Sequence, residues 1–188
     1  MESKRKIAVF ASGNGSNFDA IAKACEKGRI NATVVLCVCD RPGAYVTERA
    51  KRINIPVLEL KPKNFTSKVD YEKEILKELK KYAVDFICLA GYMRIIGDVL
   101  LKEYEGRIIN IHPSLLPAFP GVDAIGQALN YGVKVFGVTV HYVDNTLDGG
   151  KIIAQIAIPY NGDDREELEA IIHPYEHSLY VSTLCSLL

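Results

Sequence analysis

The chain has 188 residues, which is enough for one domain with a sizeable hydrophobic core. Its formal net charge is zero and its pI is about 6.9, so neither nucleic acid nor an acidic membrane is expected as its main partner. No apolar run approaches the roughly 18 residues that a membrane span requires, and the N-terminal residues show no secretory signal.

The chain has five cysteines, an odd number, and three of them lie in apolar runs that are typical of strands: Cys37, Cys39 and Cys88. We therefore expect buried free thiols rather than a disulfide framework or a zinc site. This usage is typical of a reducing compartment, so the sequence predicts a soluble cytoplasmic protein.

Apolar runs alternate with helix-period patterns along most of the chain. Short apolar runs rich in β-branched residues predict strands at 7–11, 32–39, 57–60, 86–90, 108–112, 135–143 and 152–159. Helical spacing predicts helices at about 18–27, 45–54, 69–82, 98–104 and 123–131, and from 164 to the end. We expect an α/β fold with one Rossmann-like open sheet, mostly parallel, with helices on both faces. The last two strands should form an antiparallel hairpin.

A glycine-rich turn, Ser12-Gly-Asn-Gly-Ser-Asn17, lies between the first strand and the first helix. Glycines allow a ligand to approach the backbone closely, and free amides at a helix start point at an anion, so this turn predicts a phosphate site. It matches neither the dinucleotide fingerprint nor the P-loop. The alternative is an ordinary tight turn in which Ser16 or Asn17 caps the helix.

The strand at 108–112 carries an amide and an imidazole at its end. Asn110 and His112 are two residues apart, so they project from one face, and Pro113 should end the strand. Ligands of open α/β sheets bind at such strand ends. An amide can stabilise oxygen charge, and a histidine can exchange a proton near neutral pH. The alternative is that both side chains only satisfy turn hydrogen bonds.

Two loops could complete a site. The apolar loop, Gly91-Tyr-Met-Arg-Ile-Ile-Gly97, could form the wall of a flat apolar ligand, or it could pack beneath a neighbouring helix. Asp148, in Asp148-Gly149-Gly150, either serves a turn or reaches His112 and stabilises its charged form. A metal site made of His112, His141 and Asp148 is a weaker alternative, because His141 has apolar neighbours and can be a core residue.

Three motifs together resemble the folate-dependent formyltransferases: the glycine-rich turn, Asn110-Ile-His-Pro-Ser-Leu-Leu-Pro117, and Gly137-Val-Thr-Val-His-Tyr-Val-Asp144 through Leu147-Asp-Gly-Gly150. The resemblance runs from about Lys6 to about Tyr180. The glycine-rich turn narrows it to the branch that formylates glycinamide ribonucleotide in purine (IMP) synthesis. It implies transfer of a formyl group from 10-formyltetrahydrofolate, as cosubstrate, to the amine of N1-(5-phospho-D-ribosyl)glycinamide. It also implies no metal, and a monomer or homodimer.

The resemblance further implies roles for individual residues. Catalysis would rest on Asn110, His112 and Asp148. The ribonucleotide would contact Gly15, Ser16, Asn17, Pro174, Tyr175, Glu176 and His177. The folate would contact Lys68, Met93, Arg94, Ile95, Ile96, Asn110, Asp144, Asn145, Thr146, Leu147 and Asp148. Residues 1–188 would form one domain, with ribonucleotide phosphate bound by the N-terminal half and folate binding and catalysis in the C-terminal half.

Two positions depart from the family pattern, and other functions remain as alternatives to the one that the resemblance implies. Lys68 stands where the family usually has Arg, and Lys151 where many relatives have Pro.

Methionyl-tRNA formyltransferase and formyltetrahydrofolate hydrolase share the catalytic block, but each carries an additional domain that we do not expect here. A formyltransferase acting on a sugar nucleotide amine, or a nucleotide-binding module without catalysis, remains as an alternative.

Overall fold

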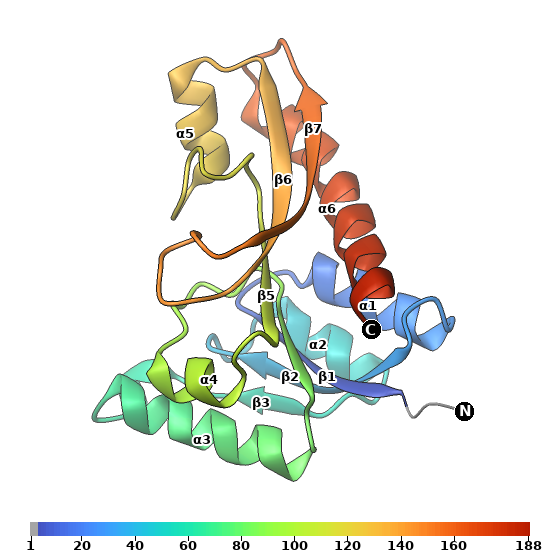
Figure 1. Cartoon of the computed structure of the whole chain (residues 1–188), viewed down its shortest axis with the longest axis vertical. Helices are drawn as coiled ribbons and strands as arrows, with labels where there is room; N and C mark the ends of the chain where they lie inside the picture. The colour runs from blue at the N-terminus through green and yellow to red at the C-terminus, as the bar shows by residue number, and fades with distance from the viewer. Residues whose placement is uncertain (1–3) are drawn as a thin grey trace.

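Seven strands form one sheet in the computed structural model, which describes residues 4–188 (Figure 1). The order is β3-β2-β1-β4-β5-β6-β7, in which β1 to β5 are parallel and β6 and β7 are antiparallel to their neighbours. The predicted fold class and the predicted hairpin are thus confirmed. The strands are β1 (Arg5–Ala11), β2 (Ala32–Cys39), β3 (Val57–Glu59), β4 (Phe86–Leu89), β5 (Ile108–His112), β6 (Val135–Tyr142) and β7 (Ile152–Pro159).

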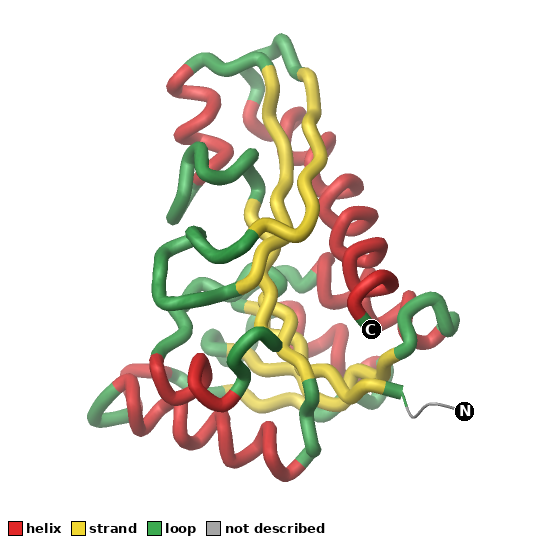
Figure 2. Tube along the Cα trace, viewed as in Figure 1, coloured by secondary structure: helices red, strands yellow, loops and turns green. Residues whose placement is uncertain are grey.

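The helices cover both faces of this sheet (Figure 2). They are α1 (Ser16–Glu26), α2 (Tyr45–Arg52), α3 (Lys68–Lys81), α4 (Asp98–Glu103), α5 (Ala124–Tyr131) and α6 (Arg165–Leu187), with a single 3-10 turn at Pro62–Asn64. Residues of α1, α2, α5 and α6 share one hydrophobic core, and residues of α3 and α4 belong to a second core. Within residues 4–188, no helix has the length and apolar character needed to cross a bilayer.

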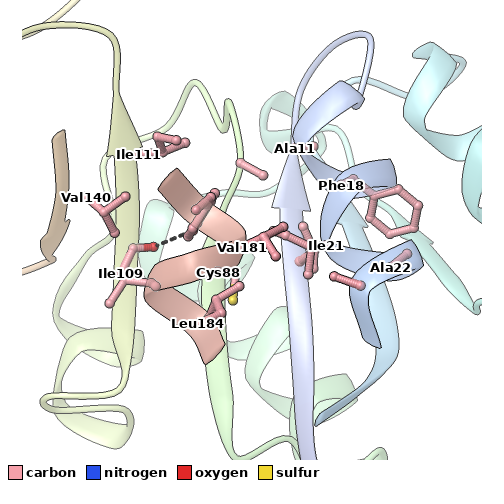
Figure 3. Close-up of a cluster of buried hydrophobic side chains, with 14 of the residues drawn as sticks. Ala11, Phe18, Ile21, Ala22, Cys88, Ile109, Ile111, Val140, Val181 and Leu184 are labelled. Carbon is pink, nitrogen blue, oxygen red and sulfur yellow. Dashed lines mark hydrogen bonds between the residues drawn. The ribbon is translucent and has the colours of Figure 1, made fainter. Parts of the chain in front are cut away.

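The contact between α6 and the sheet is centred on Tyr180, which is fully buried. Its hydroxyl donates hydrogen bonds to the carbonyl oxygens of Leu89 (2.9 Å) and Ile109 (3.3 Å), so the aromatic ring packs in the core while its polar tip is satisfied. Figure 3 shows the surrounding side chains, with Val181 and Leu184 next to residues of β4, β5 and α1. The helix therefore fixes the relative positions of β4 and β5.

The strand order places a crevice at the carboxyl ends of β1 and β4. After β1 the chain adds β2 and β3 on one side, and then returns to place β4 on the other side of β1. Where the direction of winding reverses in this way, the connecting loops diverge and leave room for a ligand. The glycine-rich turn after β1 and the apolar loop after β4 leave the sheet at this point.

The structure corrects one local expectation and confirms another. Gly15, in a left-handed conformation, is the N-cap of α1, and no side chain caps this helix, so the alternative that Ser16 or Asn17 caps it is wrong. Pro174 lies inside α6, so the predicted substrate segment from Pro174 to His177 is part of the last helix, which was predicted from 164 to the end.

Candidate functional site

A cavity of about 650 Å³ lies at the carboxyl ends of β4 and β5. It is lined by residues of these two strands, of the apolar loop, of segment 121–125 and of the loop between β6 and β7. His141 of β6, Asn17 of α1, and Arg165 and Glu176 of α6 complete the lining. Its polar lining residues include Asn17, Arg94, Asn110, His112, His141, Asp144, Asp148 and Glu176. The structure thus brings residues from both halves of the chain to one cavity.

His112, the last residue of β5, is buried at the base of this cavity. Its Nε2 lies 2.8 Å from the carbonyl oxygen of Phe119, and a carbonyl can only accept, so Nε2 carries a hydrogen. Its Nδ1 lies 3.5 Å from Oδ2 of Asp148, which is longer than an ordinary hydrogen bond to a carboxylate. The imidazole is therefore fixed through Nε2, while Nδ1 can exchange a proton with Asp148 or with a ligand.

Asp148 is held in this position by the backbone. Its φ of 49° is left-handed, which Asp tolerates better than most residues, and its Oδ2 accepts a hydrogen bond from the Gly121 amide at 2.8 Å. A Cβ at Gly150 would overlap the carbonyl oxygen of Tyr142, so only glycine lets the loop rejoin β7 this closely. Asp148 and His112 therefore lie close together, as expected. The contacts at Gly121 and Gly150 hold Asp148 in this position.

Asn110 is hydrogen-bonded to His141, which the sequence suggested as a core residue or a metal ligand. Asn110 of β5 is paired with His141 of β6 in the antiparallel register, and Asn110 Nδ2 lies 3.2 Å from His141 Nε2. His141 Nδ1 donates to the Tyr142 carbonyl at 2.8 Å, so Nε2 is the acceptor for the amide of Asn110. Burial lowers the pKa of His141, which agrees with this neutral form. The pairing orients Asn110 and leaves its second N–H free for a ligand.

His141 is therefore a site residue, although the sequence suggested it only as a core residue or as a ligand in a weaker metal-site alternative. Its Nε2 also lies 3.7 Å from Asp148 Oδ1. A sequence signal was present, because polar Thr139 and His141 alternate with valines in β6, but it was equally compatible with a core histidine. Among the described residues, no group of three or more His, Cys, Asp or Glu side chains is arranged to hold a metal ion.

The glycine-rich turn presents unoccupied hydrogen-bonding groups at the start of α1. Gly15 has φ 78°, and a Cβ at this position would lie 2.5 Å from Val46 Cγ2, so the turn requires glycine. The first amides of α1 have no side-chain acceptor, which makes this helix end suited to an anion. Asn17 lines the cavity and is buried, and its Oδ1 has no hydrogen-bond partner among residues 4–188. Gly15 and Ser16 do not themselves line the cavity.

Arg49 of α2 forms hydrogen bonds to the glycine-rich turn. Its Nε donates to the Asn14 carbonyl and its Nη2 to Asn14 Oδ1, both at 2.9 Å, and Nη1 lies 3.5 Å from Asp19 Oδ2. The Val46 amide also donates to the Gly13 carbonyl, at 3.1 Å. The start of α2 thereby holds the turn in one conformation.

The apolar loop forms one wall of the cavity, as one of the two readings of the sequence expected. Met93 and Ile95 are 55% and 65% exposed, whereas Ile96 is only 5% exposed and packs in the core beneath α3 and α4. Lys68, at the start of α3, does not line this cavity. It lines a second cavity of about 470 Å³, which shares the residues Tyr92 to Ile96 with the first.

Only one residue of the predicted 174–177 segment lines the cavity. Glu176 is 7% exposed, and its Oε2 accepts a hydrogen bond from His173 Nδ1 at 2.8 Å. This hydrogen bond raises the pKa of His173. His177 is partly buried, its Nε2 has no partner, and burial lowers its pKa. Tyr175 and Pro174 lie on α6 outside the cavity lining.

Comparison with known proteins gives consistent matches over almost the whole chain. Residues 5–184 match the formyl transferase family. The phosphoribosylglycinamide formyltransferase of Bacillus subtilis is 52% identical over 98% of this chain and 95% of its own length. Trifunctional purine biosynthetic protein adenosine-3 of Drosophila melanogaster is 42% identical over 98% of this chain, which spans 14% of that longer protein. The crystal structure of glycinamide ribonucleotide transformylase 1 from Geobacillus kaustophilus is 56% identical, with a TM-score of 0.95, over 98% of this chain and 99% of that one.

Proposed function

Since this chain belongs to the formyl transferase family, we propose that it transfers the formyl group of 10-formyltetrahydrofolate to the amine of N1-(5-phospho-D-ribosyl)glycinamide, a step of purine synthesis. The observation that carries the proposal is the arrangement of Asn110, His112 and Asp148 at the base of a cavity that also reaches Asn17. The cavity lining contains the acid–base groups, and through Asn17 it reaches the start of α1, where a phosphate could bind.

The cavity fits the two substrates in size and chemistry. Its volume of about 650 Å³ is within the range of small-molecule sites. Met93, Ile95 and Leu147 supply exposed apolar surface for a flat ring, and Asp144 and Asp148 of the same lining supply polar groups. This supports a folate between the apolar loop and the Asp148 loop.

The ribonucleotide is proposed to lie between α1 and α6. Its phosphate would accept hydrogen bonds from the uncapped amides of Gly15, Ser16 and Asn17. Glu176, whose carboxylate is fixed by His173, would accept hydrogen bonds from ribose hydroxyls. In this arrangement the N-terminal half of the chain binds the phosphate, and the C-terminal half supplies Asp148 and most of the folate contacts.

The chemistry is direct attack of the substrate amine on the formyl carbon, with no enzyme nucleophile. His112 in its charged form and the free N–H of Asn110 would donate to the oxygen that gains charge, each contributing about 3 kcal/mol. The Phe119 carbonyl fixes the ring of His112, and His141 fixes the amide of Asn110, so neither donor must reorganise during the reaction.

Asp148 is proposed to favour the charged form of His112 and to help move the proton from the attacking amine to the leaving nitrogen. Its Oδ2 faces His112 and accepts from the Gly121 amide, so the carboxylate stays oriented while the imidazole changes charge. We also propose a cytoplasmic location, because all five cysteines are free thiols and purine synthesis is a soluble pathway in a reducing compartment.

The experiment is a comparison of acceptors with one donor. Consumption of 10-formyltetrahydrofolate is followed optically with glycinamide ribonucleotide, with an amino sugar nucleotide, and with water alone. Turnover that requires the ribonucleotide supports the proposal. Turnover with the sugar nucleotide at a higher kcat/KM, or equal turnover without any amine, would replace it by a different formyltransferase or by a hydrolase.

A further inference from the structure

Asp40 is a buried carboxylate that lines neither cavity. It is the first residue after β2, its residue exposure is 3%, and its side chain is fully buried. A carboxylate buried without partners costs several kcal/mol, so its retention requires close hydrogen bonds or an opposite charge. Asp40 has both, and they come from the two loops that form the proposed substrate sites.

One oxygen of Asp40 is bound to the glycine-rich turn. Ser12 Oγ donates to Asp40 Oδ1 at 2.5 Å, and the same Ser12 Oγ accepts from the Met93 amide at 2.8 Å. The Ser12 amide in turn donates to the Gly91 carbonyl at 3.0 Å. The first residue of the glycine-rich turn is therefore joined both to Asp40 and to the backbone of the apolar loop.

The other oxygen of Asp40 is bound to the apolar loop. Arg94 Nε donates to Asp40 Oδ2 at 2.9 Å, and the side chain of Arg94 is 51% exposed. With Nε engaged, the terminal nitrogens of the guanidinium remain for the cavity, which Arg94 lines. The buried carboxylate thus determines where a half-exposed arginine sits. Loss of Asp40 would remove one hydrogen bond from Arg94 and one from Ser12 at the same time.

We propose that Asp40 is a positioning residue that holds both substrate subsites in register, one through Ser12 and the other through Arg94. Asp40 touches neither substrate in this arrangement. The inference rests on the proposed function for the identity of the two ligands. A single substitution at Asp40 should weaken the binding of both ligands, because Asp40 contacts both the glycine-rich turn and the apolar loop.

The test measures binding by calorimetry, with ribose 5-phosphate as the probe for one subsite and folate for the other. Asp40→Ala is expected to raise both dissociation constants by about tenfold or more, the size of a lost charge-assisted hydrogen bond. Asp40→Asn should rescue both to within about twofold, because its amide can accept from Arg94 and donate to Ser12. Asp85→Ala is the matched control. Asp85 directly precedes β4, and its Oδ2 accepts from the Lys6 amide near the start of β1, at the edge of the sheet away from the cavity.

If Asp40→Ala does not fold by circular dichroism, Ser12→Ala replaces it, because this change removes one link and keeps the Arg94 pair. It should weaken the binding of both probes as well, because Ser12 is the first residue of the glycine-rich turn and its Oγ accepts from the Met93 amide of the apolar loop. Weakening of only one probe, or of neither, would refute the inference, and so would equal losses in Asp40→Asn and Asp40→Ala. If the unmodified protein binds neither probe, the proposed function itself fails, which is a distinct result.

Discussion

Replacement of Gly15 by alanine tests whether the glycine-rich turn is built as a binding surface. At Gly15 the φ of 78° is left-handed, which costs a non-glycine residue about 1–2 kcal/mol. The added Cβ would also lie 2.5 Å from Val46 Cγ2 and 2.9 Å from Val46 Cα, so side chain and backbone must both shift. Overpacking of this kind costs about 1–3 kcal/mol more. We expect Gly15→Ala to lose about 2–5 kcal/mol in the free energy of unfolding.

Gly28→Ala is the matched control, because Gly28 follows the other end of the same helix, with a φ of 68° and no atom within 4 Å of the added Cβ. It should lose only the conformational part, about 1–2 kcal/mol. Urea unfolding measures both losses, and calorimetry with ribose 5-phosphate measures whether the turn still binds. Equal destabilisation of the two variants, or unchanged phosphate affinity in Gly15→Ala, would refute the account of this turn.

Three further predictions follow from individual contacts. Asp148→Asn should keep the fold and lower kcat by about 10²–10⁴-fold, whereas Asp163→Asn, at an exposed position before α6, should leave kcat unchanged; steady-state kinetics decides. The pKa of His173 is raised by Glu176, so its contribution to stability is complete below the unfolded value of 6.5 and is lost as pH rises through the folded value; His173→Gln should therefore destabilise more at pH 6 than at pH 8 in urea unfolding. Of the five thiols, only exposed Cys185 should react at once with a disulfide reagent, and buried Cys25, Cys37, Cys39 and Cys88 should react only after denaturation.

Much of the fold could be predicted because its strands are short apolar runs that end at residues, such as proline, that interrupt a strand. Pro113 ends β5 directly after His112, as expected, and β2 begins and ends at the predicted residues. The last helix was predicted from 164 to the end of the chain, across Pro174, and the structure has it at Arg165–Leu187. Tyr180 and its neighbours anchor its second half in the core.

The candidate site was predictable where it depends on one strand. Asn110 and His112 share a face because of strand periodicity alone. The role of His141 depends on the antiparallel register between β5 and β6, which places it opposite Asn110. These two strands are distant in the sequence, so local patterns do not reveal their register. Gly121 acts through its backbone amide, so no side chain could have indicated it. Asp40 could not be identified from the sequence, because the two loops that contact it are brought together only in the folded state.

The most direct test of the central claim is the rate of formyl transfer by His112→Ala, measured beside the binding of folate and ribose 5-phosphate to the same variant. The account predicts that kcat falls by about 10²–10⁴-fold, because the imidazole supplies a charged donor and a proton-transfer group. Both dissociation constants should stay within about twofold of those of the unmodified protein. Near-native kcat in this variant would contradict the claim that the cavity at the end of β5 is the catalytic centre.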